Sequence, residues 1–174
     1  THTVAEARLL TLTAREMGVA TQMGNQGHSD NGCRELCEMI WSNAIGNVQE
    51  AHVWTHRPVW KNQGRGEPFE PQTPPEGLDW DRWLGPAPWR PFNKAYAPHD
   101  WRAWQDFGAG SLGDMACHIM DPVYMCLKLN ERPWFTVEVV MQEGVNKETF
   151  PLTSTIKYHF AAGAGMPEVD VYWY

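Results

Sequence analysis

The segment Gly108-Ala-Gly-Ser-Leu-Gly-Asp114-Met-Ala-Cys-His118-Ile-Met-Asp121 carries three polar side chains at helical spacing. Asp114 and His118 are four residues apart and Asp121 follows three residues later, so one α-helix would carry all three on one stripe. An imidazole between two carboxylates on an otherwise apolar helix is suited to proton transfer or to metal binding. The apolar residues of this stretch and of its continuation include Leu112, Met115, Ala116, Ile119, Val123 and Leu127.

A purely structural role for these residues stays open. Ser111-x-x-Asp114 fits a capping box at a helix N-terminus, and His118 fits a hydrogen-bonded core histidine. Pro122 would leave the carbonyl of residue 118 without its helical partner and bend the helix near His118. Such a bend could open this turn toward a cleft, or it could be an ordinary kink.

The composition limits which classes of protein this sequence can belong to. The 174 residues allow one good core or parts of two domains, and 43% apolar content without a long apolar run predicts a soluble globular protein without a membrane span. A net charge of −7 argues against nucleic acid as the main partner. Neither the composition nor the first residue, Thr1, fixes a compartment; a cytoplasmic protein is the default and an exported one also fits.

The four cysteines have no zinc-finger spacing. Cys33 and Cys37 are four residues apart on a predicted helix, and Cys117 and Cys126 lie in or near the His118 helix. Neighbours on one helix rarely have the geometry of a disulfide, so we expect four reduced and mostly buried thiols.

The first 55 residues read as alternating helices and strands. Thr3-x-x-Glu6 predicts the start of a helix that ends at Gly18, and a second helix is predicted over residues 30–44. Short strands are predicted over residues 19–23 and 48–55. This order is typical of the end of an α/β domain.

The amino-acid composition changes after residue 55. Nine of the thirteen prolines fall between Pro58 and Pro98, and seven of the ten tryptophans lie between Trp54 and Trp104, which predicts an ordered, wrapping loop. After the Asp114 helix, alternating residues over 135–141, 155–160 and 169–174 predict strands of a largely antiparallel sheet.

Three stretches together resemble the Gfo/Idh/MocA family of glucose-fructose oxidoreductase and inositol dehydrogenase relatives. They are Thr21-Gln-Met-Gly-Asn-Gln-Gly-His28, Leu78-Asp-Trp-Asp-Arg-Trp-Leu-Gly-Pro-Ala-Pro88 and Asp106-Phe-Gly-Ala-Gly-Ser-Leu-Gly-Asp114, followed by His118. The resemblance implies α/β then α+β architecture: the tail of a Rossmann-type nucleotide domain over residues 1–55, then part of a substrate domain over 56–174. That second part would hold the Pro/Trp-rich loop (about 58–105) and a helix packed on an open-faced sheet.

The comparison with the family also shows what these residues lack. Members begin with a glycine-rich dinucleotide fingerprint after a first strand, and they carry a Glu-Lys-Pro motif whose lysine assists catalysis. Neither appears at the start of this chain. We therefore expect an incomplete enzyme that is inactive alone, with oxidoreductase activity when full length.

The resemblance also implies roles for single residues. His118 would accept the hydroxyl proton while the sugar carbon gives its hydride to NAD or NADP, and Asp114 would bind the same hydroxyl region. The turn Asn25, Gln26, Gly27 and His28 would face the nicotinamide. The expected substrate-binding residues are Asp121, Trp101, Arg102, Trp104 and Asp106, with His56 and Arg57 as weaker candidates, and a packing role stays open for each.

The substrate class implied is a sugar or polyol, and the resemblance implies a homo-oligomer formed through the C-terminal sheet. Three alternatives stay open. The first is a nicotinamide-dependent enzyme that cleaves or epimerises a glycoside by transient oxidation. The second is a metal-dependent enzyme with Asp114, His118 and Asp121 as ligands. Three ligands on one helix are poorly placed for the coordination geometry of a metal ion. The third is a non-catalytic carbohydrate-binding module built on the tryptophans.

Overall fold

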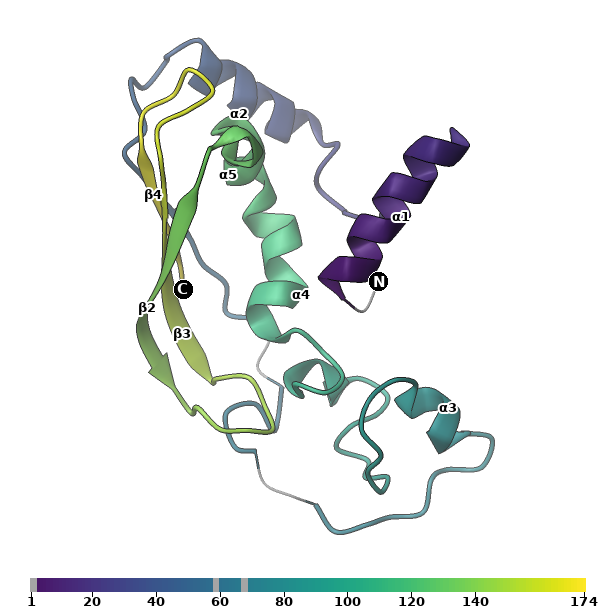
Figure 1. The fold of residues 1–174 in the computed structure, drawn as a ribbon. Coiled ribbons are helices and arrows are strands. Elements are labelled where there is room, and N and C mark those ends of the chain that lie inside the picture. The colour runs from purple at the N-terminus through teal and green to yellow at the C-terminus, as the bar shows by residue number, and fades with distance from the viewer. Residues whose placement is uncertain (1–2, 58–59, 67–68) are drawn as a thin grey trace.

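A four-stranded sheet forms the centre of the computed structural model, which describes residues 3–57, 60–66 and 69–174 (Figure 1). The strand order is β1-β4-β3-β2; β2, β3 and β4 are antiparallel, and β1 pairs parallel to β4. The predicted mixed α/β fold with a largely antiparallel sheet is confirmed. The strands are β1 (Glu50–Val53), β2 (Phe135–Glu143), β3 (Thr153–Phe160) and β4 (Val169–Trp173).

Helices cover one face of this sheet. Figure 1 shows α2 (Asn31–Trp41), α4 (Gly110–Ile119) and α5 (Asp121–Cys126) on the same side of the strands. Alternate residues of β4 are buried beneath them because successive side chains of a strand point to opposite faces. The residues that form this core include Cys37, Cys126, Leu127, Phe160, Val169, Val171, Ile156 and Trp173.

The N-terminal helix has the predicted ends. α1 (Val4–Met17) begins with a complete capping box between Thr3 and Glu6, and it ends at Gly18, whose φ of 64° suits glycine. The strand predicted over 19–23 is wrong, since these residues form no strand. A β-strand needs a neighbour for its backbone N–H and C=O groups, and this exposed segment pairs with none among the described residues.

The strand predicted over 48–55 is present in a shorter form, as β1. It joins the same sheet as β2, β3 and β4, which come more than eighty residues later, and its partner is β4. The predicted division of the chain near residue 55 stays a prediction.

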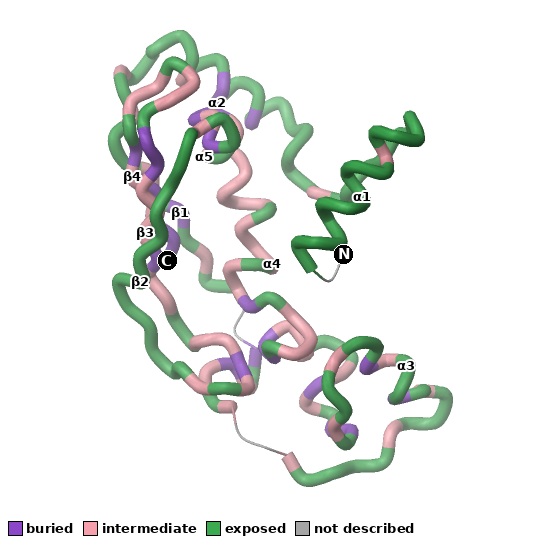
Figure 2. The backbone as a smooth tube through the Cα atoms, viewed as in Figure 1, coloured by how far each residue is buried: buried purple, intermediate pink, exposed green. Residues whose placement is uncertain are grey.

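The Pro- and Trp-rich stretch contains little regular structure but has its own core. Only α3 (Trp80–Leu84) and the 3₁₀ helix η1 (Asp100–Ala103) interrupt its described part, and Pro58, where the expected loop begins, lies outside the described residues. Figure 2 shows buried segments gathered around α3, apart from the sheet. The buried residues of this second core are Trp60, Trp80, Leu84, Phe92, Tyr96, Ala103 and Trp104.

Two glycines allow α4 to start where it does. A Cβ at Gly108 would lie 2.4 Å from the backbone oxygen of Arg102, and one at Gly110, whose φ is +64°, would lie 2.5 Å from Cγ of Phe150. Gly108-x-Gly110-x-x-Gly113 has the spacing of a dinucleotide fingerprint, but it follows η1 and a turn rather than a strand. These two glycines therefore allow Arg102 and Phe150 to pack closely against the start of the helix that carries His118.

Candidate functional site

The predicted stripe of three polar residues is divided between two helices. Asp114 and His118 lie on α4, whereas Asp121 is the first residue of α5. Pro122 stands in the first turn of α5, where a missing N–H costs nothing, so it begins a new helix instead of bending one long helix. The expectation that all three residues share one helix is therefore wrong.

The capping-box alternative for Asp114 is also wrong. The residue that caps α4 is Ala109, which provides no side-chain hydrogen bond, and Ser111 lies inside the helix. The Ser111 hydroxyl accepts a hydrogen bond from the amide nitrogen of Gln63 at 3.1 Å. The carboxylate of Asp114 is thus available to a partner outside its own helix.

His118 contacts the turn that was expected to face the nicotinamide. Its Nδ1 lies 3.0 Å from the carbonyl oxygen of Gln26. A carbonyl oxygen only accepts hydrogen bonds, so Nδ1 carries the proton and the neutral imidazole keeps its lone pair on Nε2. His118 is partly exposed, which excludes a dry apolar core around it.

A second histidine ties the same turn to α5. Nδ1 of His28 lies 2.7 Å from a carboxylate oxygen of Asp121, whose side chain is only 15% exposed. Between these two contacts lies Gly27, with a φ of 100°. The turn over residues 25–28 is therefore held across the junction of α4 and α5 from both sides, while Asn25 is partly buried within it.

Asp114 is held by a residue from η1. Nε of Arg102 lies 3.4 Å from Oδ1 of Asp114, and both side chains are about one-third exposed at 31% and 33%. The guanidinium of Arg102 also stacks on Trp101 at 4.5 Å from the ring centroid and donates to the carbonyl of His99. The structure thus brings Trp101, Arg102 and Asp114 together, as a row that leads to the N-terminal half of α4.

Trp104 and Asp106 contact residues other than Asp114 and His118. Trp104 is 1% exposed and packs in the second core. Asp106 pairs with Arg90, which also binds Glu148. Although burial lowers the pKa of Arg90, hydrogen bonds with Tyr96 and Glu148 and the charge of Asp106 raise it above its ordinary value. These contacts give both residues a packing role in the structure.

A cavity of about 520 Å³ opens at the N-terminal end of α4, between this helix and the ends of β1, β3 and β4. Ser111, which lines it, precedes Asp114 by three residues and His118 by seven, so all three lie on one face of the helix. His56 and Arg57 also line it. Sequence reasoning missed Gln63, which also lines the cavity, because no motif marks a buried glutamine in an irregular segment.

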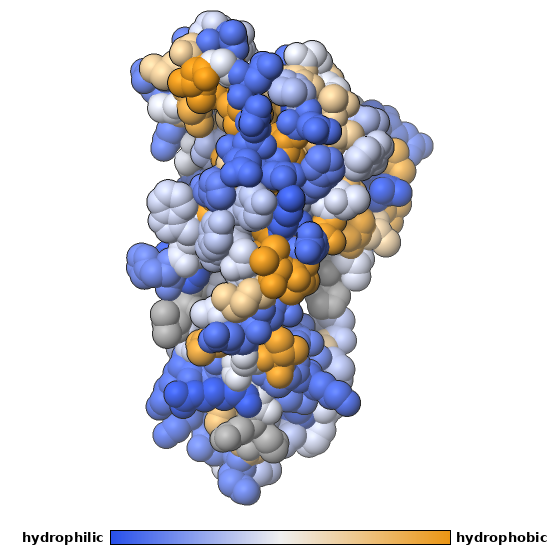
Figure 3. Space-filling model, turned by 90° about the vertical axis from the view of Figure 1, so that its left-hand side faces the viewer, coloured by the Kyte–Doolittle hydropathy of each residue, from blue (hydrophilic) through white to orange (hydrophobic). Residues whose placement is uncertain are grey.

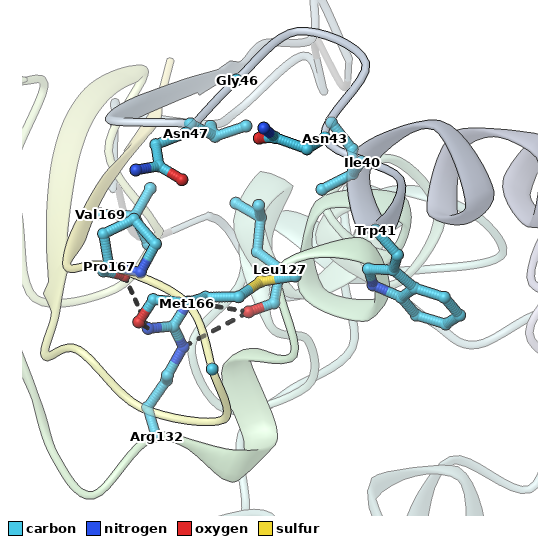
Figure 4. Close-up of a pocket in the computed structure, with 12 residues that line it drawn as sticks. Ile40, Trp41, Asn43, Gly46, Asn47, Leu127, Arg132, Met166, Pro167 and Val169 are labelled. Atoms are coloured by element: carbon cyan, nitrogen blue, oxygen red, sulfur yellow. Dashed lines mark hydrogen bonds between the residues drawn. The ribbon is translucent and has the colours of Figure 1, made fainter.

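A cavity of about 290 Å³ beside Arg132 has a structural explanation (Figure 4). The guanidinium makes five N–H···O contacts, to the carbonyls of Leu127, Ala161, Met166 and Pro167. Burial lowers the pKa of Arg132. Because its donors are already used by the backbone, Arg132 fastens the β3–β4 connection to the end of α5 and offers little to a ligand.

The structure bears on the alternative functions. Within the described ranges, no three His, Cys, Asp or Glu side chains form a group that could hold a metal ion. Nor does any described helix have the length and apolar character needed to cross a bilayer. Among the tryptophans, four pack in the interior, and the exposed ones are spread over separate elements; the four buried ones are Trp60, Trp80, Trp104 and Trp173.

A comparison with family models adds an independent result. The model described as "Oxidoreductase family, C-terminal alpha/beta domain" matches residues 38–166, which is more than half of the chain. The chain belongs to the Gfo/Idh/MocA oxidoreductase family. A search of curated proteins found no match. In this Gfo/Idh/MocA chain the matched region contains α4, α5 and the whole of β2 and β3.

Gfo/Idh/MocA proteins generally use nicotinamide cofactors. A dinucleotide's diphosphate binds at a glycine-rich turn between a strand and a helix, and no described strand leads through such a turn into a helix. The turn over residues 25–28 contacts His118 through the carbonyl oxygen of Gln26.

Proposed function

We propose that this oxidoreductase transfers a hydride between a sugar or polyol and NAD or NADP, with His118 as the proton acceptor. The observation that carries the proposal is the 3.0 Å contact between Nδ1 of His118 and the carbonyl oxygen of Gln26. It fixes the tautomer in which Nε2 accepts a proton. It also holds the imidazole ring against the turn over residues 25–28, to which the proposal assigns the nicotinamide.

Oxidation of a secondary alcohol removes a hydride from carbon and a proton from oxygen. Nε2 of His118 takes the hydroxyl proton, and the imidazolium that forms is stabilised by the Gln26 carbonyl. Asp114, one turn earlier on α4, accepts a hydrogen bond from the substrate through Oδ2, while its Oδ1 faces Arg102. Arg102 thereby positions the carboxylate.

When bound, the nicotinamide supplies the acceptor for the hydride, so that the alcohol carbon becomes a carbonyl carbon. In the proposal Asn25, Gln26, Gly27 and His28 hold this ring. Asp121 acts through His28, because its carboxylate binds Nδ1 at 2.7 Å and keeps the turn against α5. Asp121 is thus a positioning residue in this proposal.

The test is an assay of the full-length protein with a panel of sugars and polyols and with each nicotinamide cofactor. Reduced nicotinamide formed in a one-to-one ratio to oxidised substrate supports the proposal. Product formed without net reduction of the cofactor would instead support the glycoside-cleaving alternative. Product formation that needs no nicotinamide would refute both.

We also propose that the open face of the sheet joins two copies of the chain. Figure 3 shows this face as mainly hydrophilic, with apolar side chains in separate patches. Three rings form a stacked row on it: His52 lies 5.0 Å from Tyr172 and 5.9 Å from Tyr174. Tyrosine is enriched at the centre of protein interfaces, where its ring packs and its hydroxyl bonds.

A further inference from the structure

Gln63, which lines the cavity at the N-terminal end of α4, carries a buried acceptor without a donor among the described residues. The side chain of Gln63 is 3% exposed, and its amide nitrogen donates to the carbonyl of Pro151 at 2.6 Å and to Ser111. The carbonyl of Pro151 can only accept, so the amide cannot be flipped. Oε1 of Gln63 is buried and has no hydrogen-bond partner among the described residues.

An unsatisfied buried acceptor destabilises the fold because it has lost its hydrogen bonds to water without replacement. A ligand hydroxyl in the cavity would satisfy it after a small shift of the Gln63 side chain that exposes Oε1, since this atom has almost no accessible surface in the structure. Hydroxyl groups of Ser111, Thr153, Ser154 and Thr155 line the same space, and Leu112 and Trp173 provide apolar surface. The cavity volume of about 520 Å³ lies within the ordinary range for small-molecule sites. These features suit a polyhydroxylated ring.

Arg57 adds a positive charge to the lining of the cavity. His56 and Arg57 line it, and neither side chain pairs with an acidic group in the described part of the chain. This is notable in a chain of net charge −7. α4 also starts here without a side-chain cap, so the N–H groups of its first turn add positive potential. An anion is therefore the charge that this opening favours.

We propose that this cavity binds an anionic sugar, a polyhydroxylated ring that carries a carboxylate or a phosphate group. Arg57 binds the anionic group and Oε1 of Gln63 accepts from a ring hydroxyl. Because Ser111, Asp114 and His118 share one face of α4, a ring held here extends toward the catalytic pair. The identification of this ligand as the substrate rests on the proposed function; the binding itself does not.

The experiment measures binding to the chain by isothermal titration with D-glucuronate, D-glucose 6-phosphate and D-glucose at one ionic strength. Glucuronate and glucose 6-phosphate separate a carboxylate from a phosphate as the preferred anion. The test variant is Arg57→Gln, and the matched control is Arg34→Gln, an exposed arginine on α2.

We expect at least one anionic sugar to bind more tightly than glucose, and Arg57→Gln to weaken that binding about 10- to 100-fold, as for the loss of a hydrogen bond to a charged group. Arg34→Gln should leave binding unchanged. A third variant, Ser111→Ala, should weaken all the sugars that bind. Melting curves for each variant confirm that it is folded.

Equal affinity for glucose and the anionic sugars, no effect of Arg57→Gln, or no binding of any of the three would overturn the proposal. His118→Ala separates it from the proposed function. That variant should keep the anionic sugar bound, whatever its turnover. Undiminished turnover by His118→Ala together with loss of binding in Arg57→Gln would refute His118 as the proton acceptor and leave the anionic site standing.

Discussion

The imidazole of His118 and the backbone carbonyl of Gln26 are 3.0 Å apart, although 92 residues separate them in the chain. This contact decides which imidazole nitrogen can act as a base. It also makes the shape of an exposed turn part of the candidate site. The predictions that follow test this relationship and the packing that maintains it.

Replacing His118 by alanine should lower turnover of the full-length enzyme by roughly 10²- to 10⁴-fold, the range for the loss of a positioned general base. Nicotinamide affinity should hardly change. Asp114→Asn keeps the shape but removes the charge that Arg102 pairs with, so its loss of turnover should be smaller. Turnover per folded molecule is the measurement, with thermal melting beside it. A His118→Ala protein that melts early yet works normally per folded molecule would support a purely structural histidine.

Gly110→Ala should destabilise the fold by roughly 1–3 kcal/mol, as overpacking does. The new Cβ would lie 2.5 Å from Cγ of Phe150, at a φ of +64° that L-residues rarely adopt. The matched control is Gly32→Ala on α2, where no atom lies within 4 Å of the added Cβ. Chemical denaturation of both variants gives the free energies of unfolding. Equal stabilities would show that α4 does not need a glycine at this start.

The thiols should differ sharply in reactivity. Cys33, Cys37 and Cys126 are buried and Cys117 is exposed, and all four are free, as the sequence predicted. Burial, reinforced by the charge of Cys37, raises the pKa of Cys126 to about 11, which leaves little thiolate at neutral pH. A thiol reagent at pH 8 should therefore label one cysteine quickly and the others only after unfolding. Cys117→Ser should abolish the fast phase; a fast phase that survives would contradict the burial of the other three.

The carboxylate of Asp170 should stabilise the sheet in a pH-dependent way. Burial raises the pKa of Asp170, but hydrogen bonds from Lys157 and His159 outweigh it and hold the pKa below its ordinary value. A depressed carboxyl pKa contributes stability above the unfolded pKa of about 3.9, and this is lost as the pH falls through the folded pKa.

Asp170→Asn should accordingly lower the Tm by about 2–4 °C at pH 7, equivalent to roughly 1 kcal/mol, and the difference from the parent should shrink below pH 4. Glu168→Gln, an exposed neighbour with no ion pair in the described chain, is the control and should change little. A Tm difference that is constant from pH 7 to pH 3 would show that the charge of Asp170 does not matter.

Self-association through the open face should depend on the ring row. Tyr172→Lys places a second cation beside Lys157, whose amine lies 5.6 Å from the ring in the parent, so a symmetric interface would bring like charges together. Sedimentation should then show the apparent mass falling toward that of one chain. Tyr124→Lys, on the helical side, is the control for a surface tyrosine. An unchanged mass for Tyr172→Lys would place any interface elsewhere.

The sequence by itself determined the elements whose signals are local. The capping box at Thr3 and Glu6 and the glycine at Gly18 define α1, since each group acts within one helical turn. Alternation located β3 and β4, because a strand with one buried face must repeat every two residues. The i, i+4 spacing placed Asp114 and His118 on one helix, because residues four apart lie on the same face of a helix.

Only the tertiary structure decided what these elements meet. Residues 19–23 have strand-like sequence but no partner strand among the described residues, whereas β1 forms because β4 lies beside it. Asp121 lies on a separate helix from Asp114 and His118 and pairs with His28. Gln63, in an irregular segment, binds Ser111. Strand pairing and side-chain contacts join residues distant in the chain, so their free energy depends on the whole fold and leaves no local pattern in the sequence.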